Sequence, residues 1–205
     1  MLKIYGVKTS SNVQKVLWCC AELGLPFERD ETTGGPFRGD RTAAYLALNP
    51  NGLIPTIDDD GFILWESNVV VRYLSAKHGT GTLCPVDLQQ RADCERWMDW
   101  QQTVIAPPMG VLFRALLRKP PDGTPEDQLR TALQKAGEAW KILDTHLVTR
   151  SFVGGAMLTM GDIAFGNAIH RWYKLPVERP DLPHIKAWYG CFCARPPYQQ
   201  HVASI

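Results

Sequence analysis

Apolar and polar residues alternate in short runs within the first third of the chain. Residues 2–5 (LKIY) are the first such run, and their two-residue period predicts a short strand. After a polar corner, apolar residues recur at the spacing of a helix with one buried face, at Val13, Val16, Leu17, Cys20 and Leu23. Gly24 and Pro26 follow, and both are typical of a helix end.

Further strand and helix patterns follow in a definite order. They predict a strand at residues 26–31, a helix at 42–50, a hairpin formed by 53–58 and 62–65, and a helix at 66–79. A helix connects the first two strands, which makes them parallel, and the hairpin closes the sheet. We therefore expect residues 1–79 to form an α/β domain of thioredoxin type.

The alternating runs stop near residue 88, and helical spacing takes over. Helices are predicted at 89–106, 110–119, 125–148, 160–175 and 183–194. We expect a second, all-helical domain at 88–205, joined to the first by a linker at 80–87. Pro107 and Pro108 should interrupt the first long helix of this domain and bend the chain, because proline removes a helical hydrogen bond.

Charge and hydropathy argue against several classes of protein, namely nucleic-acid-binding, membrane-bound and secreted ones. The chain has 205 residues, 22 basic and 21 acidic, and a net charge of +1. This balance argues against a nucleic-acid or membrane-surface partner. No apolar run reaches the ~18 residues of a membrane span, and the N-terminus lacks the apolar stretch of a signal peptide. We expect a soluble cytoplasmic protein.

Cysteine and histidine residues give no metal-ligand pattern. The six cysteines include the adjacent pair Cys19 and Cys20, and the five histidines are scattered. We expect reduced, structural cysteines and no metal site.

The segment NPNGLIPTI (49–57) places a proline just before a predicted strand. If the bond between Ile54 and Pro55 is cis, the chain turns sharply and the backbone of Ile54 can pair with an extended peptide. The alternative is a turn proline that only starts the strand.

The segment WESNVVVRYL (65–74) begins a helix with polar residues. The helix N-terminus near Ser67 suits a ligand carboxylate, and Glu66 beside it suits an ammonium group. Together they suit the head group of an amino acid. The alternative is that Ser67 or Asn68 only caps the helix.

Three motifs in this order resemble those of the cytosolic glutathione transferases. They are Tyr5-Gly6…Ser10, Asn49-Pro50-Asn51-Gly52…Ile54-Pro55 and Glu66-Ser67…Arg72-Tyr73-Leu74. The all-helical second half fits as well. The segment LTMGDIAF (158–165) resembles the family's helix-capping box, with Thr159 as cap and Asp162 reaching back. The serine-type, bacterial-like branch is the most similar.

The resemblance implies a role for the polar corner before the first helix. Ser10 falls where the serine type has the hydroxyl that donates to the glutathione sulfur, with Ser11 as the second choice. Asn12 could add an amide donor and is the expected helix cap. A donor to sulfur stabilises the reactive thiolate and lowers the thiol pKa. The alternative is that these residues only cap the helix. A dithiol redox role is disfavoured because the corner has no C-x-x-C motif.

The resemblance also implies further ligand contacts. Arg41 falls where relatives hold the glycyl carboxylate of glutathione, and Ile54, Glu66 and Ser67 are expected to bind the rest of the tripeptide. Leu53 departs from the Gln or Lys of many relatives. An electrophile pocket is expected at Leu112, Phe113 and Trp172, although aromatic residues at helical spacing are more often core.

The implied activity is transfer of glutathione to a small hydrophobic electrophile, with glutathione as co-substrate and no other cofactor. The implied assembly is a homodimer. Two alternatives stay open. The same site could serve dehalogenation, isomerisation or peroxide reduction, or the chain could be a non-catalytic interaction domain.

Overall fold

The computed structural model describes residues 1–33, 42–120 and 123–204. The chain forms two compact units, one of Met1–Val86 with Arg195–Ile205 and the other of Asp87–Ala194. The division after Val86 falls within the expected linker. The C-terminal end of the chain differs from expectation, because residues from Arg195 onward belong to the first unit.

A four-stranded mixed sheet forms the centre of the first unit. Its strands are β1 (Leu2–Tyr5), β2 (Phe27–Asp30), β3 (Thr56–Asp59) and β4 (Phe62–Trp65), in the spatial order β2-β1-β3-β4. Strand β1 is parallel to β2 and antiparallel to β3, and β3 is antiparallel to β4. The predicted parallel pair and closing hairpin are therefore confirmed.

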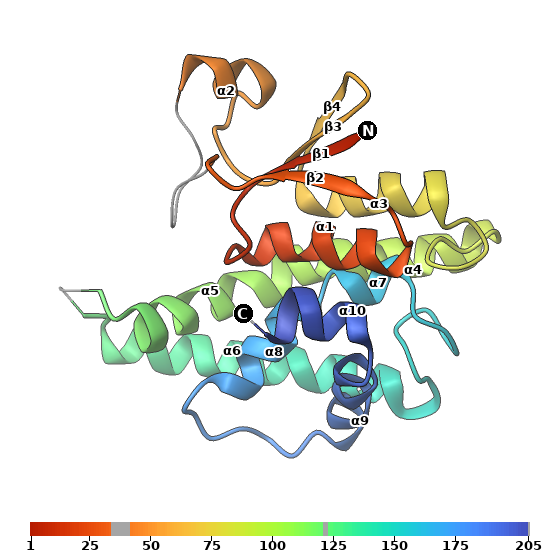
Figure 1. Ribbon diagram of the computed structural model, residues 1–205. Coiled ribbons are helices and arrows are strands. Elements are labelled where there is room, and N and C mark those ends of the chain that lie inside the picture. Colours follow the sequence, from red (N-terminus) through yellow and green to blue (C-terminus); the bar gives the residue numbers. More distant parts are fainter. Residues whose placement is uncertain (34–41, 121–122, 205) are drawn as a thin grey trace. The chain divides into compact units, whose positions relative to one another are not determined.

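Helices α1 (Ser11–Glu22), α2 (Ala43–Leu48) and α3 (Ser67–His78) surround this sheet. Helices α1 and α3 pack side by side on one face of it (Figure 1). The apolar spacing of α1 explains this packing, because its repeating apolar side chains are fully buried, at Val13, Val16, Leu17 and Cys20. Leu23, just beyond the helix, is partly exposed.

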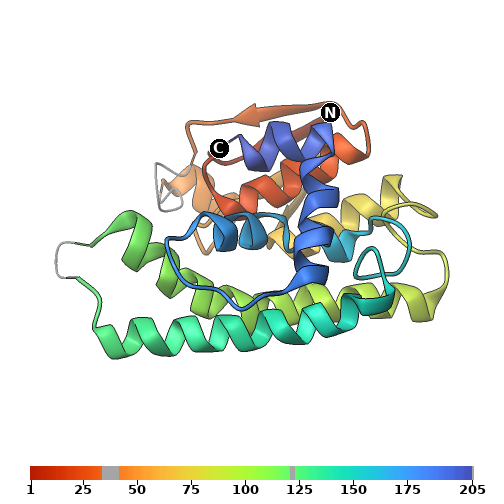
Figure 2. The ribbon, with the colours of Figure 1, turned by 90° about the horizontal axis from the view of Figure 1, so that it is seen from below.

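The C-terminal segment packs on α1 within the same unit. It consists of α10 (Pro196–Tyr198) and a π-helical turn, Gln199–Ala203 (Figure 2). The ring of Tyr198 meets the ring of Trp18 edge-on with centroids 4.8 Å apart. Arg195 donates from Nε to the carboxylate of Glu22 at 2.7 Å. Sequence reasoning did not predict these helical turns, because they are too short for a clear apolar period.

The second unit is all-helical, as expected. Its helices are α4 (Leu88–Trp100), α5 (Ala106–Phe113), α6 (Glu126–His146), α7 (Met160–Ile163), α8 (Gly166–Lys174) and α9 (Pro183–Cys193). Helices α5 and α6 run side by side (Figure 2). Aromatic rings fill its core, at Trp140, Phe165, Trp172, Trp188 and Phe192.

The predicted break at Pro107 and Pro108 is wrong. Helix α4 continues through a π-helical turn, Gln101–Ile105, directly into α5. The N–H of Ala106 donates to the carbonyl of Gln101, the longer bond of a π-turn. Both prolines lie in the first turn of α5, where proline is tolerated in place of an N–H donor. The backbone therefore stays helical past the two rings.

The predicted capping box at the start of α7 is confirmed. The carboxylate of Asp162 accepts a hydrogen bond from the backbone N–H of Thr159 at 2.8 Å. It also accepts from the N–H of Val153 and the indole of Trp188, both at 2.9 Å. One buried carboxylate thus joins the preceding loop, α7 and α9.

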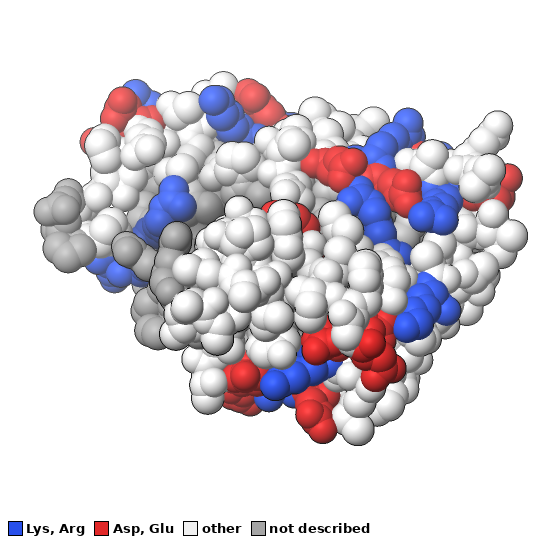
Figure 3. Space-filling model, turned by 90° about the horizontal axis from the view of Figure 1, so that it is seen from above, with Lys and Arg blue, Asp and Glu red and all other residues white. Residues whose placement is uncertain are grey.

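Acidic and basic side chains lie among one another on the face shown in Figure 3. Among the described residues, no helix is both long and apolar enough to cross a membrane.

Candidate functional site

A small cavity of about 50 Å³ lies within the first unit. It is lined by Asn12, Asn49, Asn51, Leu53, Ile54, Pro55, Glu66 and Ser67. These residues come from the first turn of α1, the loop before β3, and the junction of β4 with α3. The structure therefore brings together Asn12, Ile54, Glu66 and Ser67 from three separate segments of the chain.

Side chains from α2 and its C-terminal end fix the loop before β3. The buried Asn49 amide donates to the carbonyl of Leu53 at 2.8 Å, and the Tyr45 hydroxyl donates to the same carbonyl at 2.7 Å. The Asn49 side-chain oxygen accepts from the N–H of Asn51 at 3.0 Å. The bond between Ile54 and Pro55 is cis.

The entry to α1 differs from expectation at its cap. The N-cap is Ser10 and not Asn12, which lies exposed in the first turn. The Ser10 side chain makes no capping hydrogen bond, although its carbonyl accepts from the N–H of Gln14 at 2.9 Å. Capping therefore does not occupy the Ser10 hydroxyl. Neither Ser10 nor Ser11 lines the small cavity.

Gly6 brings the entry of α1 close to the loop that carries Ile54. A Cβ built on Gly6 would lie 2.6 Å from Val13 Cγ2 and 3.2 Å from Ile54 Cβ. The φ angle of Gly6 is +145°, which a side chain rarely permits. Only a residue without a side chain allows these two segments such a close approach.

The junction of β4 with α3 carries an unusual backbone conformation. Glu66 is the N-cap of α3 and has φ +73°. A residue other than glycine held at positive φ costs about 1–3 kcal/mol, and such residues gather at functional sites. Its side chain makes no capping hydrogen bond. The Glu66 carboxylate thus lies at the cavity beside the nearly buried Ser67.

A buried lysine that sequence reasoning missed connects the two helices at this site. Lys15, one turn after Asn12 in α1, is 6% exposed. Its ammonium donates to the amide oxygen of Asn68, in the first turn of α3, at 3.0 Å. Burial lowers the pKa of Lys15 to about 8, against the attraction of the Glu66 charge. The signal for it was a lysine inside the mostly apolar stretch VQKVLWCC.

The thiols of α1 do not qualify as nucleophiles. Cys19 and Cys20 are buried and free. Burial raises the pKa of Cys19 to about 12 and that of Cys20 further, so both stay protonated near neutral pH.

The expected electrophile residues of the second unit do not share one environment. Leu112 and Trp172 are fully buried, and Trp172 packs against Trp140 with ring centroids 6.2 Å apart. Phe113 is partly exposed and carries the guanidinium of Arg171 over its ring. Of the three residues, only Phe113 is therefore accessible in the structure. Arg41 lies outside the described residues.

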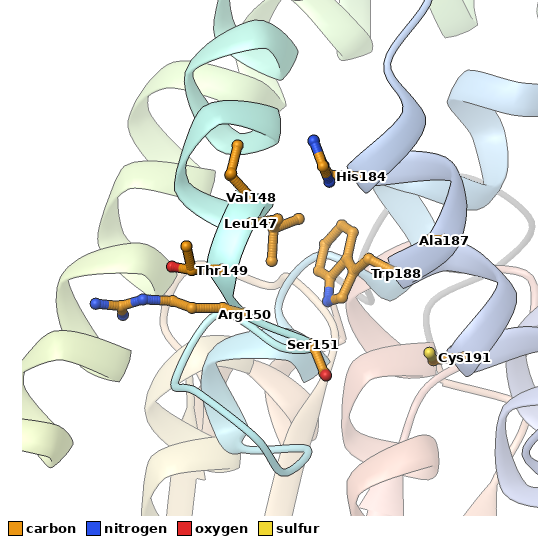
Figure 4. A pocket seen from close by; sticks show the side chains of 9 residues that line it. All are labelled: Leu147, Val148, Thr149, Arg150, Ser151, His184, Ala187, Trp188 and Cys191. Atoms are coloured by element: carbon orange, nitrogen blue, oxygen red, sulfur yellow. The ribbon is translucent and has the colours of Figure 1, made fainter.

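A larger cavity of about 450 Å³ lies in the second unit, between residues 147–151 and helix α9 (Figure 4). Leu147 and Trp188 face each other there, while Arg150 extends away from Trp188 toward its ion pair with Asp93. None of the residues expected to bind a ligand lines this cavity.

Comparison with known proteins agrees with this geometry. Family models for the glutathione S-transferase N-terminal and C-terminal domains match residues 9–77 and 126–191. The chain is 34% identical to glutathione S-transferase GstB of Escherichia coli K12, over 96% of this chain and 95% of that protein. It is 32% identical to glutathione S-transferase 3 of Zea mays, over 100% of this chain and 94% of that protein.

Solved structures give the same result. The theta class glutathione S-transferase of Xanthomonas axonopodis pv. citri, with glutathione bound, superposes with a TM-score of 0.92 and 41% identity. The match covers 98% of this chain and 96% of that one. On the family models, the relatives and the fold, this chain belongs to the glutathione S-transferase family.

Proposed function

We propose that this enzyme binds glutathione at the small cavity and stabilises its thiolate for attack on a hydrophobic electrophile. The observation that carries the proposal is the convergence of Asn12, Ile54, Glu66 and Ser67 on one cavity. Resemblance of short motifs had pointed to these residues separately. Their gathering supports a common ligand.

The γ-glutamyl head group is proposed to lie at Glu66 and Ser67. The head group carries an ammonium and a carboxylate. Glu66 attracts the ammonium, while the Ser67 hydroxyl and the N-terminus of α3 attract the carboxylate. The cavity of about 50 Å³ exceeds the ~30 Å³ of one water molecule but is far smaller than a tripeptide. It would hold the charged end, and the remainder would run over the surface.

The middle of the tripeptide is proposed to pair with the backbone of Ile54, as an added strand would. Arg41 is proposed to hold the glycyl carboxylate. Leu53 lines the cavity but offers no side-chain donor. This substitution should leave the affinity for glutathione modest.

Thiolate stabilisation is proposed to come from the Ser10 hydroxyl. The thiol proton leaves to solvent, and the hydroxyl donates to the sulfur anion. With an aryl chloride, the sulfur then forms a bond to the carbon that carries chlorine. The carbon–chlorine bond breaks and chloride leaves with its electron pair. Serine acts only as a donor, so no histidine base is required.

Location and assembly complete the proposal. We propose a cytoplasmic enzyme that forms a homodimer, as the family resemblance implies. Light scattering at micromolar concentration should give about twice the mass of the 23.0 kDa chain. A mass of one chain would contradict the assembly without affecting the glutathione site.

Calorimetric titration with glutathione tests the site. Ser67→Ala should weaken binding by about 1.5–3 kcal/mol, the contribution of a hydrogen bond to a charged group. Ser151→Ala, an exposed serine of the second unit, is the matched control and should bind like the parent. Equal affinity in the parent and Ser67→Ala would remove Ser67 from the site.

A further inference from the structure

Two arginines approach the ring of Phe113 in the second unit. The guanidinium carbon of Arg171, on α8, lies 3.7 Å from the ring centroid. That of Arg118, at the end of the π-helical turn Arg114–Arg118, lies 5.1 Å from it. Residues from α8 and from the end of the long first helix thus place two cations around one aromatic side chain.

The surroundings of Arg171 do not neutralise its charge. Within the part of the chain that the structure describes, no carboxylate lies within ion-pair distance of Arg171. Partial burial and the nearby Arg118 lower the pKa of Arg171 to about 10. Burial lowers the pKa of His170, and the positive charges of Lys174 and Arg171 lower it further. The ring of Phe113 therefore carries a half-buried guanidinium without an ion-pair partner among the described residues, and a second guanidinium lies close to the same ring.

A purely structural stack explains one arginine over the ring of Phe113 but not the second one beside it. One arginine over an aromatic ring is a favourable contact, because the cation is attracted to the negative face of the ring. A second guanidinium near the first opposes that gain, because like charges repel and burial weakens their solvation. An anion between the two guanidinium groups would attract both of them, and it would compensate for their repulsion and for their weakened solvation. The planar guanidinium edge also presents the paired N–H donors that fit a carboxylate.

We infer that Arg118 and Arg171 bind an acidic group of the electrophilic substrate, with the apolar body of that substrate against Phe113. The inference rests on the proposed function and on the expectation from the sequence that Phe113 borders the electrophile. It deepens that function by naming the substrate class, namely aromatic or apolar electrophiles that carry a carboxylate or a similar anion.

Turnover of two matched electrophiles tests this preference. Chlorodinitrobenzene is neutral, whereas chlorodinitrobenzoate carries a carboxylate on a similar ring. In Arg171→Met, kcat/KM for the benzoate should fall about ten-fold or more, relative to the neutral compound. Arg171→Lys should recover part of the loss, and Arg118→Met should show the same direction. Arg130→Met removes one exposed charge on α6 and is the control.

The outcomes separate the two proposals. A stack that only supports the fold would lower turnover of both compounds equally, and an unchanged ratio in Arg171→Met and Arg118→Met overturns the inference alone. Absence of turnover with either compound in the parent enzyme would count against the proposed function. Dinitrobenzoate, which lacks chlorine and cannot react, then provides an independent calorimetric test. It should bind the parent several-fold more tightly than Arg171→Met, and equal binding overturns the inference whatever the activity.

Discussion

The ammonium of Lys15 in α1 donates a hydrogen bond to the side-chain oxygen of Asn68 in α3, 53 residues later in the chain. Both side chains are nearly inaccessible to solvent. The two helices that flank the small cavity are thus joined by a buried cation. This contact has a consequence for stability that depends on pH.

Lys15→Met should change the pH dependence of unfolding. The pKa of Lys15 is about 8 in the folded protein against 10.5 ordinarily. Between these values the unfolded chain binds a proton that the folded chain does not, so the free energy of unfolding rises with pH. The parent should therefore gain stability relative to Lys15→Met as pH rises from 8 to 10.5.

Urea unfolding of both proteins at intervals across this range measures the effect. Near pH 7 the methionine variant should be at least as stable as the parent, because a buried charge is often replaced by an apolar side chain without loss. Lys135→Met, exposed on α6, is the control and should follow the parent. Parallel curves for the parent and Lys15→Met would show that Lys15 keeps its ordinary pKa.

Ser10→Ala should lower turnover near neutral pH by about ten-fold, if the lost hydrogen bond contributes ~1.4 kcal/mol. Loss of a donor to the thiolate raises the pKa of the bound thiol. The pH profile of kcat should therefore shift to higher pH, while glutathione affinity changes less. Ser11→Ala is the matched comparison and should be milder. If only Ser11→Ala shifts the profile, the two serines exchange roles. If neither does, Asn12 or backbone N–H groups stabilise the thiolate.

Gly6→Ala should destabilise the first unit and weaken glutathione binding together. The added Cβ would overlap Val13 and press on Ile54, at an unfavourable φ, with a cost of about 1–3 kcal/mol. Gly24→Ala is the control, since φ there is also positive but nothing lies within 4 Å of the added Cβ. Thermal unfolding and calorimetry on both variants distinguish overlap from backbone strain. Equal losses in the two would leave Gly6 without a role at the cavity.

Tyr198→Ala should destabilise the first unit although it lies near the end of the chain. The side chain is fully buried, and its ring packs on Trp18. Truncation of a large buried aromatic residue costs about 3–5 kcal/mol. Gln200→Ala, exposed two residues later, should have little effect. Urea unfolding followed by the fluorescence of Trp18 and the other indoles measures the difference, and similar midpoints for the two variants would contradict the packing.

Local sequence signals predicted the buried faces of helices and the positions where helices begin. The apolar spacing from Val13 to Cys20 determines the buried face of α1, and Thr159 and Asp162 determine the start of α7. Contacts between distant segments were not predictable in this way. The hydrogen bond from Lys15 to Asn68 depends on how α1 and α3 pack, and no periodicity in the sequence indicates it.

The candidate site likewise contains residues that the sequence predicts and residues that only the structure reveals. Glu66 and Ser67 are adjacent, so their pattern could be recognised in the sequence, whereas the buried supports Asn49 and Tyr45 act through a loop geometry that only the structure shows. Local rules also misled at Pro107. A single proline rule predicts a break, but the preceding π-turn supplies a path on which the helix continues.

The first unit is built from both ends of the described chain, and this has a consequence for biosynthesis. The face of α1 that carries Trp18 is covered by Tyr198, which the ribosome makes more than a hundred residues after the sheet is complete. At about 5–20 residues per second, the 133 positions from Trp65 to Tyr198 take roughly 7–27 s. During that time the nascent first unit presents a Trp18 ring without its Tyr198 cover and a Glu22 carboxylate without its Arg195 partner. The last helical turns complete the first unit only after the second unit has been synthesised.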